Sequence, residues 1–268
     1  MSVRRFYAPS DAFAPSGGAA AREVVLSAEE SRHLRDVLRL RAGDEATVFD
    51  GEGREFACVV RESGGGRGGR GEARGAAAVL DVRGPVEPPR PESPLALVLA
   101  VALLKGEKFD LVVQKATELG VRAVVPVVTR RADVRLRDAR DAGARLERWR
   151  RLALEAAKQS GRARVPAVAE PVEFSEFVAL SPSEDALRLM FSERDGATLA
   201  EALIGMGAAD APALTALVGP EGGWESEEID AALASGWRVV TLGGRVLRAE
   251  TAAIAVAALL QHLRGDLK

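Results

Sequence analysis

Two glycine-rich turns late in the chain hold the residues best suited to chemistry. Residues 219–224 read GPEGGW, and residues 242–251 read LGGRVLRAET. Each turn follows an apolar run and precedes a helical pattern, so it would display backbone amides at the carboxyl edge of a sheet. Glycine allows a positive φ or a close approach of the backbone to a ligand. Two such turns in succession predict a ligand-binding crevice.

Charged side chains in these turns are suited to handling an anion or a proton. Arg245 and Arg248 can hold an anion or the edge of a base, and Glu221 sits inside its turn, where a carboxylate needs amide or arginine partners. Glu250 begins the following helix. A structural interpretation stays open, in which Arg248 pairs with Glu250 or Glu221 and simply ties the turns together.

Several other chemistries are excluded. The segment LKGEKFD, after the apolar run 95–104, contains neither a dinucleotide-binding GxGxxG nor a P-loop pattern. One cysteine, Cys58, and two histidines, His33 and His262, cannot build a cysteine-rich or multi-histidine centre, so we expect no metal.

The elements that position the turns belong to an α/β pattern that starts near Val79. Apolar runs predict parallel strands at 95–104, 122–128, 186–191, 214–218 and 238–242. Helical patterns predict helices at 109–120, 138–160, 225–234 (capped by Ser226) and 248–263, with a short one near Leu199. The last helix is apolar almost all round, which favours burial against the sheet and against a second subunit, and hence a homodimer.

The first part of the chain predicts a small β-rich domain with one helix. Ser27 and Glu30 have the spacing of a capping box, which favours a helix over 28–38. Apolar runs on both sides of 51–53 predict a hairpin. The Gly/Arg-rich segment 63–75 is interpreted as an exposed loop or hairpin tip, which is either a tolerated insertion or a segment whose arginines touch RNA. We therefore expect two domains, residues 1–76 and residues 77–268.

Composition and charge limit the location and the partners. Hydrophobic residues make up 47% and charged residues 28%, and the longest apolar run is shorter than the roughly 20 residues that span a bilayer. Without an export signal, a cytoplasmic protein with no membrane contact is expected. Residues 130–164 hold twelve basic against five acidic side chains, whereas residues 170–230 hold two against fourteen. The basic segment is typical either of phosphate contacts or of a solvated helix.

GPEGGW followed by LGGRVLRAETA resembles the paired signature of the knotted SPOUT methyltransferases, and specifically of the 16S ribosomal RNA uridine N3-methyltransferase family. RRFYAP, HLRDVLRLRAGDEATVFDGEG, KGEKFDLVVQKATELGV and EAAKQSGRARVP resemble that family's other landmarks in their usual order. The Gly/Arg stretch 64–75 is longer than the family's pattern. The resemblance implies a PUA-like β-barrel, then an α/β domain with a deep trefoil knot. It also implies S-adenosylmethionine as cofactor, 16S rRNA or the small ribosomal subunit as partner, and a homodimer.

Roles for individual residues follow from this resemblance. The implied cofactor pocket consists of Leu217, Gly219, Pro220, Gly222, Leu242, Gly243, Val246, Leu247 and Thr251. Arg248 is expected at the carbonyl oxygens of the base, with Glu221 or Glu250 as an orienting or proton-accepting carboxylate. RNA phosphates are assigned to Arg4, Arg5, Arg148, Arg150 and Arg151. Two alternatives remain: another SPOUT enzyme that methylates a ribose or a different base, and a non-catalytic RNA-binding factor.

Overall fold

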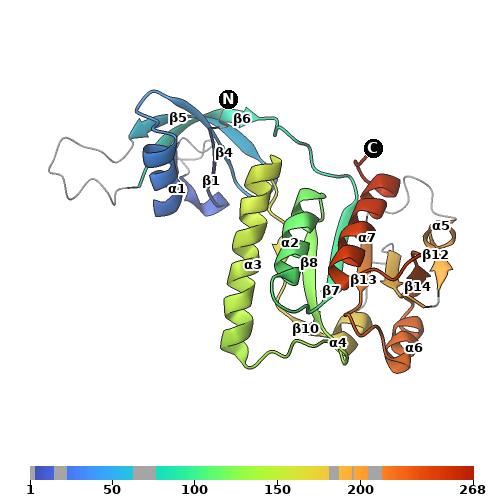
Figure 1. Ribbon diagram of the computed structural model, residues 1–268. Helices are drawn as coiled ribbons and strands as arrows, with labels where there is room; N and C mark the ends of the chain where they lie inside the picture. Colours follow the sequence, from blue (N-terminus) through green and yellow to red (C-terminus); the bar gives the residue numbers. More distant parts are fainter. Residues whose placement is uncertain (1–3, 15–22, 63–76, 181–186, 195, 205–212) are drawn as a thin grey trace. The chain divides into compact units, whose positions relative to one another are not determined.

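The computed structural model describes residues 4–14, 23–62, 77–180, 187–194, 196–204 and 213–268 (Figure 1). The chain divides into two compact units. Unit 1 consists of residues 1–92 and 157–165, and unit 2 consists of residues 93–156 and 166–268. Each unit is considered by itself. The predicted loop 63–75 lies outside the described residues.

Unit 1 is built on a mixed sheet of six strands in the order β1-β4-β5-β6-β3-β2. Its strands are β1 (Arg5–Tyr7), β2 (Phe13–Ala14), β3 (Glu23–Val25), β4 (Glu45–Phe49), β5 (Glu55–Glu62) and β6 (Val79–Val86). The short helices are η1 (Ser10–Ala12), α1 (Ala28–Arg32) and η2 (His33–Val37). Only β1 and β4 pair in parallel, and the other neighbours are antiparallel. The β-rich domain is confirmed, as a half-barrel whose edge strands are β1 and β2.

Local chemistry explains the start of the helix and the hairpin. The Ser27 Oγ accepts a hydrogen bond from the Glu30 N–H at 3.2 Å, and α1 begins at Ala28 as predicted. β4 and β5 form the predicted hairpin, and Gly51 and Gly53 between them have φ values of +80° and +109°. Those values favour glycine because a Cβ is strained there.

The boundary between the units differs from the predicted one at residue 76. β6 pairs with both β5 and β3, and its Leu80 is buried in the core of unit 1. The strand therefore belongs to the first sheet and not to the α/β part. Residues 157–165 also return to unit 1, where the Val165 N–H donates to the Gly51 carbonyl at 2.9 Å. Spacing along the chain cannot reveal a return from so far away.

Unit 2 contains an all-parallel sheet in the order β10-β8-β7-β13-β11-β14-β12, with β9 paired to β8. Its strands are β7 (Ala96–Ala102), β8 (Ala123–Val128), β9 (Ala167–Val168), β10 (Val172–Glu173), β11 (Leu187–Phe191), β12 (Ala197–Thr198), β13 (Ala213–Val218) and β14 (Arg238–Thr241). Its helices are α2 (Lys108–Glu118), α3 (Ala139–Ser160, whose last turn is in unit 1), α4 (Phe174–Ala179), α5 (Leu199–Ala202), α6 (Ser226–Ala234) and α7 (Ala249–Arg264). The predicted α/β class and its main strands and helices are confirmed.

The helices of unit 2 pack in pairs against its sheet. α7 lies beside α2 and contacts β7 and β13, while α4 packs against α6 (Figure 1). Trp224 and Trp237 are buried in the core that α4 and α6 share with the sheet. In the described part of the chain, no helix is both long and apolar enough to cross a bilayer.

Candidate active site

A cavity of about 510 Å³ opens at the carboxyl edge of unit 2, where β11, β13 and β14 end and α7 begins. It is lined by Phe191, Ser192, Glu193, Arg194, Val218, Gly219, Pro220, Glu221, Thr241, Leu242, Gly243, Gly244, Arg245, Val246, Leu247, Arg248, Ala249, Ala252 and Val256. Both glycine-rich turns contribute to the wall. The predicted crevice therefore exists, and its size suits a small-molecule ligand.

Most of the predicted pocket residues line this cavity, and three do not. Gly219, Pro220, Leu242, Gly243, Val246 and Leu247 are in the wall. Leu217 is absent from it because its side chain is packed in the core cluster with Trp224. Gly222 instead lies against Arg131, and Thr251 is exposed on α7.

Sequence reasoning missed the segment 191–194 at the end of β11. This strand pairs with β13 on one side and β14 on the other, so its last residues reach the same edge as both turns. Strand order is not visible in the sequence. Ala252 and Val256 were also missed, although they stand four and eight residues after Arg248, the spacing of one helix face.

Two consecutive glycines form an open cradle in the wall. Gly243 and Gly244 have φ values of +67° and +72°, and a Cβ built on either would meet nothing within 4 Å. The Gly243 N–H donates to the Thr241 Oγ1 at 3.2 Å, which fixes the bend. The backbone conformation here favours glycine, and the space in front of it is free for a ligand.

The turn 219–224 is fixed from two sides. A Cβ on Gly219 would stand 2.9 Å from the Trp224 ring, whose Nε1 donates to the Phe191 carbonyl at 2.8 Å. Gly223 has a φ of +69°, and a Cβ there would collide with the Glu193 Oε1. Close packing and backbone conformation together explain the glycines of GPEGGW.

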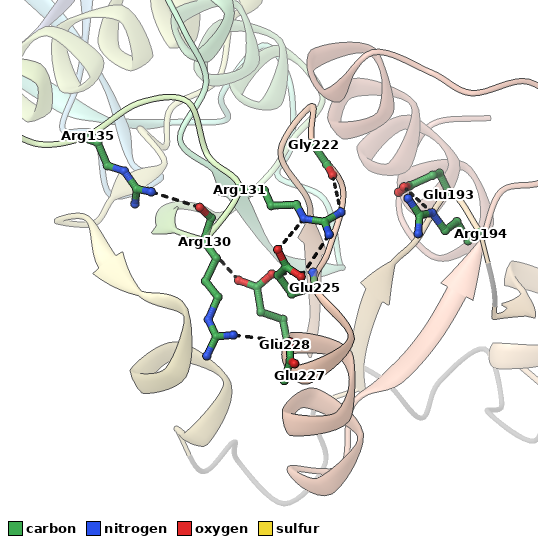
Figure 2. Close-up of polar contacts among 9 residues, drawn as sticks. All are labelled: Arg130, Arg131, Arg135, Glu193, Arg194, Gly222, Glu225, Glu227 and Glu228. Carbon is green, nitrogen blue, oxygen red and sulfur yellow. Dashed lines mark hydrogen bonds and ion pairs between the residues drawn. The ribbon is translucent and has the colours of Figure 1, made fainter.

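An arginine from the loop after β8 closes the same turn (Figure 2). Arg131 donates from Nε and Nη2 to the Glu225 carboxylate at 2.7 and 3.1 Å, and from Nη1 to the Gly222 carbonyl at 3.1 Å. Hydrogen bonding to Glu225 raises the pKa of Arg131, and the same contact lowers the pKa of Glu225. Both groups stay charged at neutral pH, so the contact persists.

The start of α6 belongs to this network. Glu225 is the N-cap and Ser226 is the first helical residue, so the predicted cap is wrong by one position. The Glu228 Oε2 accepts from the Glu225 N–H at 3.0 Å, and its Oε1 accepts from the Arg130 N–H at 3.2 Å. Figure 2 shows these contacts joining the β8 loop to α6. Glu228 is buried and structural.

The carboxylates of the two turns meet a lysine that sequence reasoning did not single out. Lys108 Nζ lies 2.7 Å from Glu221 Oε1 and 3.6 Å from Glu250 Oε2. The hydrogen bond to Glu221 raises the pKa of Lys108. Glu221 and Glu250 are thus paired with Lys108, and not with Arg248 as the structural interpretation expected. Arg248 is the exposed N-cap of α7 and lines the cavity.

The assignment of Arg5 to RNA is wrong. Its side chain is 4% exposed and holds Glu55 through three hydrogen bonds of 3.0 to 3.1 Å, so it cannot reach a phosphate. Its neighbour Arg4 is 51% exposed and lies 3.8 Å from Asp44.

The three arginines assigned on α3 are exposed. Arg148 donates to Asp110 at 2.8 Å, and Arg150 donates to the Val168 carbonyl at 3.3 and 3.4 Å. Arg151 is on the same helix.

Comparison with known families supplies the class of the protein. Residues 91–261, more than half of the chain, match the family described as RNA methyltransferase domain. Residues 26–67 match the family described as RNA methyltransferase PUA domain. The chain therefore combines an RNA methyltransferase domain with an RNA methyltransferase PUA domain.

Individual relatives narrow this class. The chain is 34% identical over 241 residues to the Ribosomal RNA small subunit methyltransferase E of Synechocystis sp., covering 90% of this chain and 73% of the relative. It is 36% identical over 241 residues to the Mycobacterium tuberculosis protein of the same name, covering 89% and 85%. The chain belongs to the ribosomal RNA small subunit methyltransferase E family, which confirms the predicted resemblance.

Solved structures agree with this membership. The Neisseria gonorrhoeae Ribosomal RNA small subunit methyltransferase E, crystallised with S-adenosyl methionine, superimposes with a TM-score of 0.80 at 32% identity, covering 99% of this chain and 100% of that one. A Legionella pneumophila methyltransferase in complex with the same cofactor gives a TM-score of 0.80 at 30% identity, covering 100% of both chains.

Proposed function

We propose that this protein methylates N3 of a uridine in 16S ribosomal RNA, using S-adenosylmethionine. Its family membership makes it an S-adenosylmethionine-dependent rRNA methyltransferase. The observation that carries the proposal is the glycine-lined cavity with Arg248 and Glu221 in its wall.

The residues present fit the cofactor. Gly243 and Gly244 form the open cradle, while Val218, Leu242 and Leu247 offer apolar contacts to an adenosine. S-adenosylmethionine supplies an electrophilic methyl group on a sulfonium. Positioning and charge compensation are then the main tasks of the protein.

Arg248 and Glu221 are assigned complementary tasks. N3 of uridine is a poor nucleophile until its proton is lost. The cavity wall contains two carboxylates, Glu193 and Glu221, and we assign Glu221 as the one that accepts this proton. Arg248 donates to the carbonyl oxygens of the base, where the negative charge then resides. Glu250 lies outside the wall, so we assign it an orienting role.

RNA binding is assigned to exposed arginines of both units. Arg4 in unit 1, and Arg148, Arg150 and Arg151 on α3, are the candidates for phosphate contacts. Arg148 already contacts Asp110, and Arg150 already contacts the Val168 carbonyl. Of the three arginines on α3, Arg151 is therefore the strongest candidate for a phosphate contact.

A homodimer through α7 is also proposed. Leu259 and Leu263 on this helix are 39% and 49% exposed, and a second subunit would remove them from water. The trefoil knot and the cytoplasmic location remain predictions of the sequence.

Methyl transfer to unmodified small ribosomal subunits tests the proposal. S-adenosylmethionine with a labelled methyl group is supplied, the RNA is digested, and the nucleosides are separated and identified by mass spectrometry. Labelled N3-methyluridine is the expected product. Label in a ribose or in another base would show that the protein is a SPOUT enzyme that methylates a different position. Cofactor binding without transfer would favour a non-catalytic RNA-binding factor.

Arg248→Ala tests the role of the arginine. We expect S-adenosylmethionine to bind with near-normal affinity while transfer is lost, measured by calorimetry and by the labelled assay. Loss of cofactor binding instead would assign Arg248 to the pocket itself.

A further inference from the structure

Lys108 joins three elements at the edge of the cavity. It is the first residue of α2, and its Nζ lies 2.7 Å from Glu221 Oε1 in the β13 turn and 3.6 Å from Glu250 Oε2 in the first turn of α7. One ammonium therefore bridges the two carboxylates that the two glycine-rich turns contribute.

Glu250 requires such a counter-charge. Its side chain is 12% exposed, and its buried Oε2 has no hydrogen-bond partner among the residues that the structure describes. A carboxylate so placed loses much of its hydration, and a cation nearby offsets that cost. The helix dipole at the amino terminus of α7 also favours the negative charge of Glu250, but it supplies no positive charge beside Glu221.

We propose that Lys108 is a positioning residue for methyl transfer: it holds the Glu221 side chain directed at the cavity, and Glu250 holds the lysine from the side of α7. The inference rests on the proposed role of Glu221 as proton acceptor. Without the ammonium, the two carboxylates would face each other with no cation between them, and their mutual repulsion would displace the Glu221 side chain.

The other charges near Lys108 have partners of their own. Lys105 pairs with Asp133 at 2.8 Å, and this contact is the main cause of the lowered pKa of Asp133. On α2 and its N-cap, Asp110 and Glu107 both contact Arg148. The Lys108 charge is thus directed at Glu221 and Glu250, with Arg248 on the adjacent cavity wall.

The test compares Lys108→Met, Lys108→Arg and the control Lys105→Met in the full-length protein. The measured quantities are the Kd for S-adenosylmethionine and the kcat and KM for RNA. Lys105→Met removes a neighbouring ammonium that pairs with an exposed carboxylate, so it should behave as the parent protein.

For Lys108→Met we expect kcat to fall roughly 10- to 100-fold, as when a reacting group is misplaced by about an ångström, with little change in cofactor Kd. KM for RNA should change much less than kcat, because the lysine acts on the reacting group and not on RNA binding. Lys108→Arg should restore most of the rate, because it keeps a cation beside Glu221.

Three results would overturn the inference. A parental kcat for Lys108→Met shows that the lysine is dispensable. A loss of cofactor and RNA affinity that accompanies the loss of kcat, or a loss that Lys108→Arg does not repair, shows a merely structural role. If Lys108→Met fails to fold, the kcat of Lys108→Gln compared with that of Lys108→Arg decides.

Glu221→Gln separates this inference from the proposed function. If Glu221→Gln transfers methyl groups at the parental rate, the proposed role of Glu221 fails. If Glu221→Gln is inactive while Lys108→Met is unaffected, only the role of Lys108 fails.

Discussion

The buried pair Arg5–Glu55 provides a strong test of the structure of unit 1. The two side chains are 4% and 2% exposed, and three hydrogen bonds of 3.0 to 3.1 Å join them. Arg5 also donates to the Arg162 carbonyl at 2.9 Å and lies 4.0 Å from the centre of the Phe49 ring. Arg5→Met removes the cation and leaves the Glu55 carboxylate buried without its partner.

The magnitude follows from this geometry. Breaking a buried pair by removing one partner costs about 3–5 kcal/mol, a large part of the 5–15 kcal/mol that typically separates folded from unfolded states. Replacing both partners, Arg5→Met with Glu55→Leu, should recover part of this loss because no charge of the pair remains buried. A deficit of about 1–3 kcal/mol should persist, since the Arg162 carbonyl loses its donor. Arg4→Met is the matched control, since an exposed ion pair contributes only about 0–1 kcal/mol.

Urea unfolding with two probes measures the effect. The single tyrosine, Tyr7, lies beside Phe49 in unit 1, whereas the three tryptophans lie in unit 2. Tyrosine absorbance should therefore report a lower midpoint for Arg5→Met than for Arg4→Met. The reasoning is refuted if Arg5→Met costs less than about 1 kcal/mol and instead lowers the salt dependence of RNA binding, the signature of a phosphate contact.

Four further outcomes are expected. Changing Arg150 and Arg151 together to Ala should weaken RNA binding and leave cofactor affinity intact. The slope of log K for RNA binding against log salt concentration should fall by up to about two. Filter binding at several salt concentrations measures this slope, and an unchanged slope would show that neither arginine contacts phosphate. Gly243→Val should raise the S-adenosylmethionine Kd at least about tenfold by calorimetry, because φ is +67° there and the new side chain enters the cradle. Burial raises the pKa of the Cys58 thiol to about 12, so iodoacetamide at pH 8 should label it only after unfolding. The same pKa shift should make unit 1 less stable as pH rises from about 9 toward 12, because only the unfolded thiol ionises in that range. A urea midpoint that does not change over this pH range would contradict the prediction.

The local features of this protein were predictable because they depend on neighbouring residues. Glycine at positions with positive φ, such as Gly243, marks a sharp turn, and an apolar run such as 95–104 marks a buried strand. The Ser27 cap of α1 also follows from residues three apart. These signals suffice for the α/β class, for the two turns, and for the crevice between them.

Contacts between distant parts of the chain were not predictable in this way. Arg4 and Arg5 are adjacent and alike, yet Arg4, which precedes β1, is exposed, whereas Arg5, the first residue of β1, is buried beside Glu55, fifty residues away. Lys108 reaches Glu221 across 113 residues. The sequence by itself determined the elements and the residues of the two turns, because backbone conformation and periodicity are local. Only the tertiary structure decided which charges meet, because strand order and long-range packing select partners that spacing along the chain does not specify.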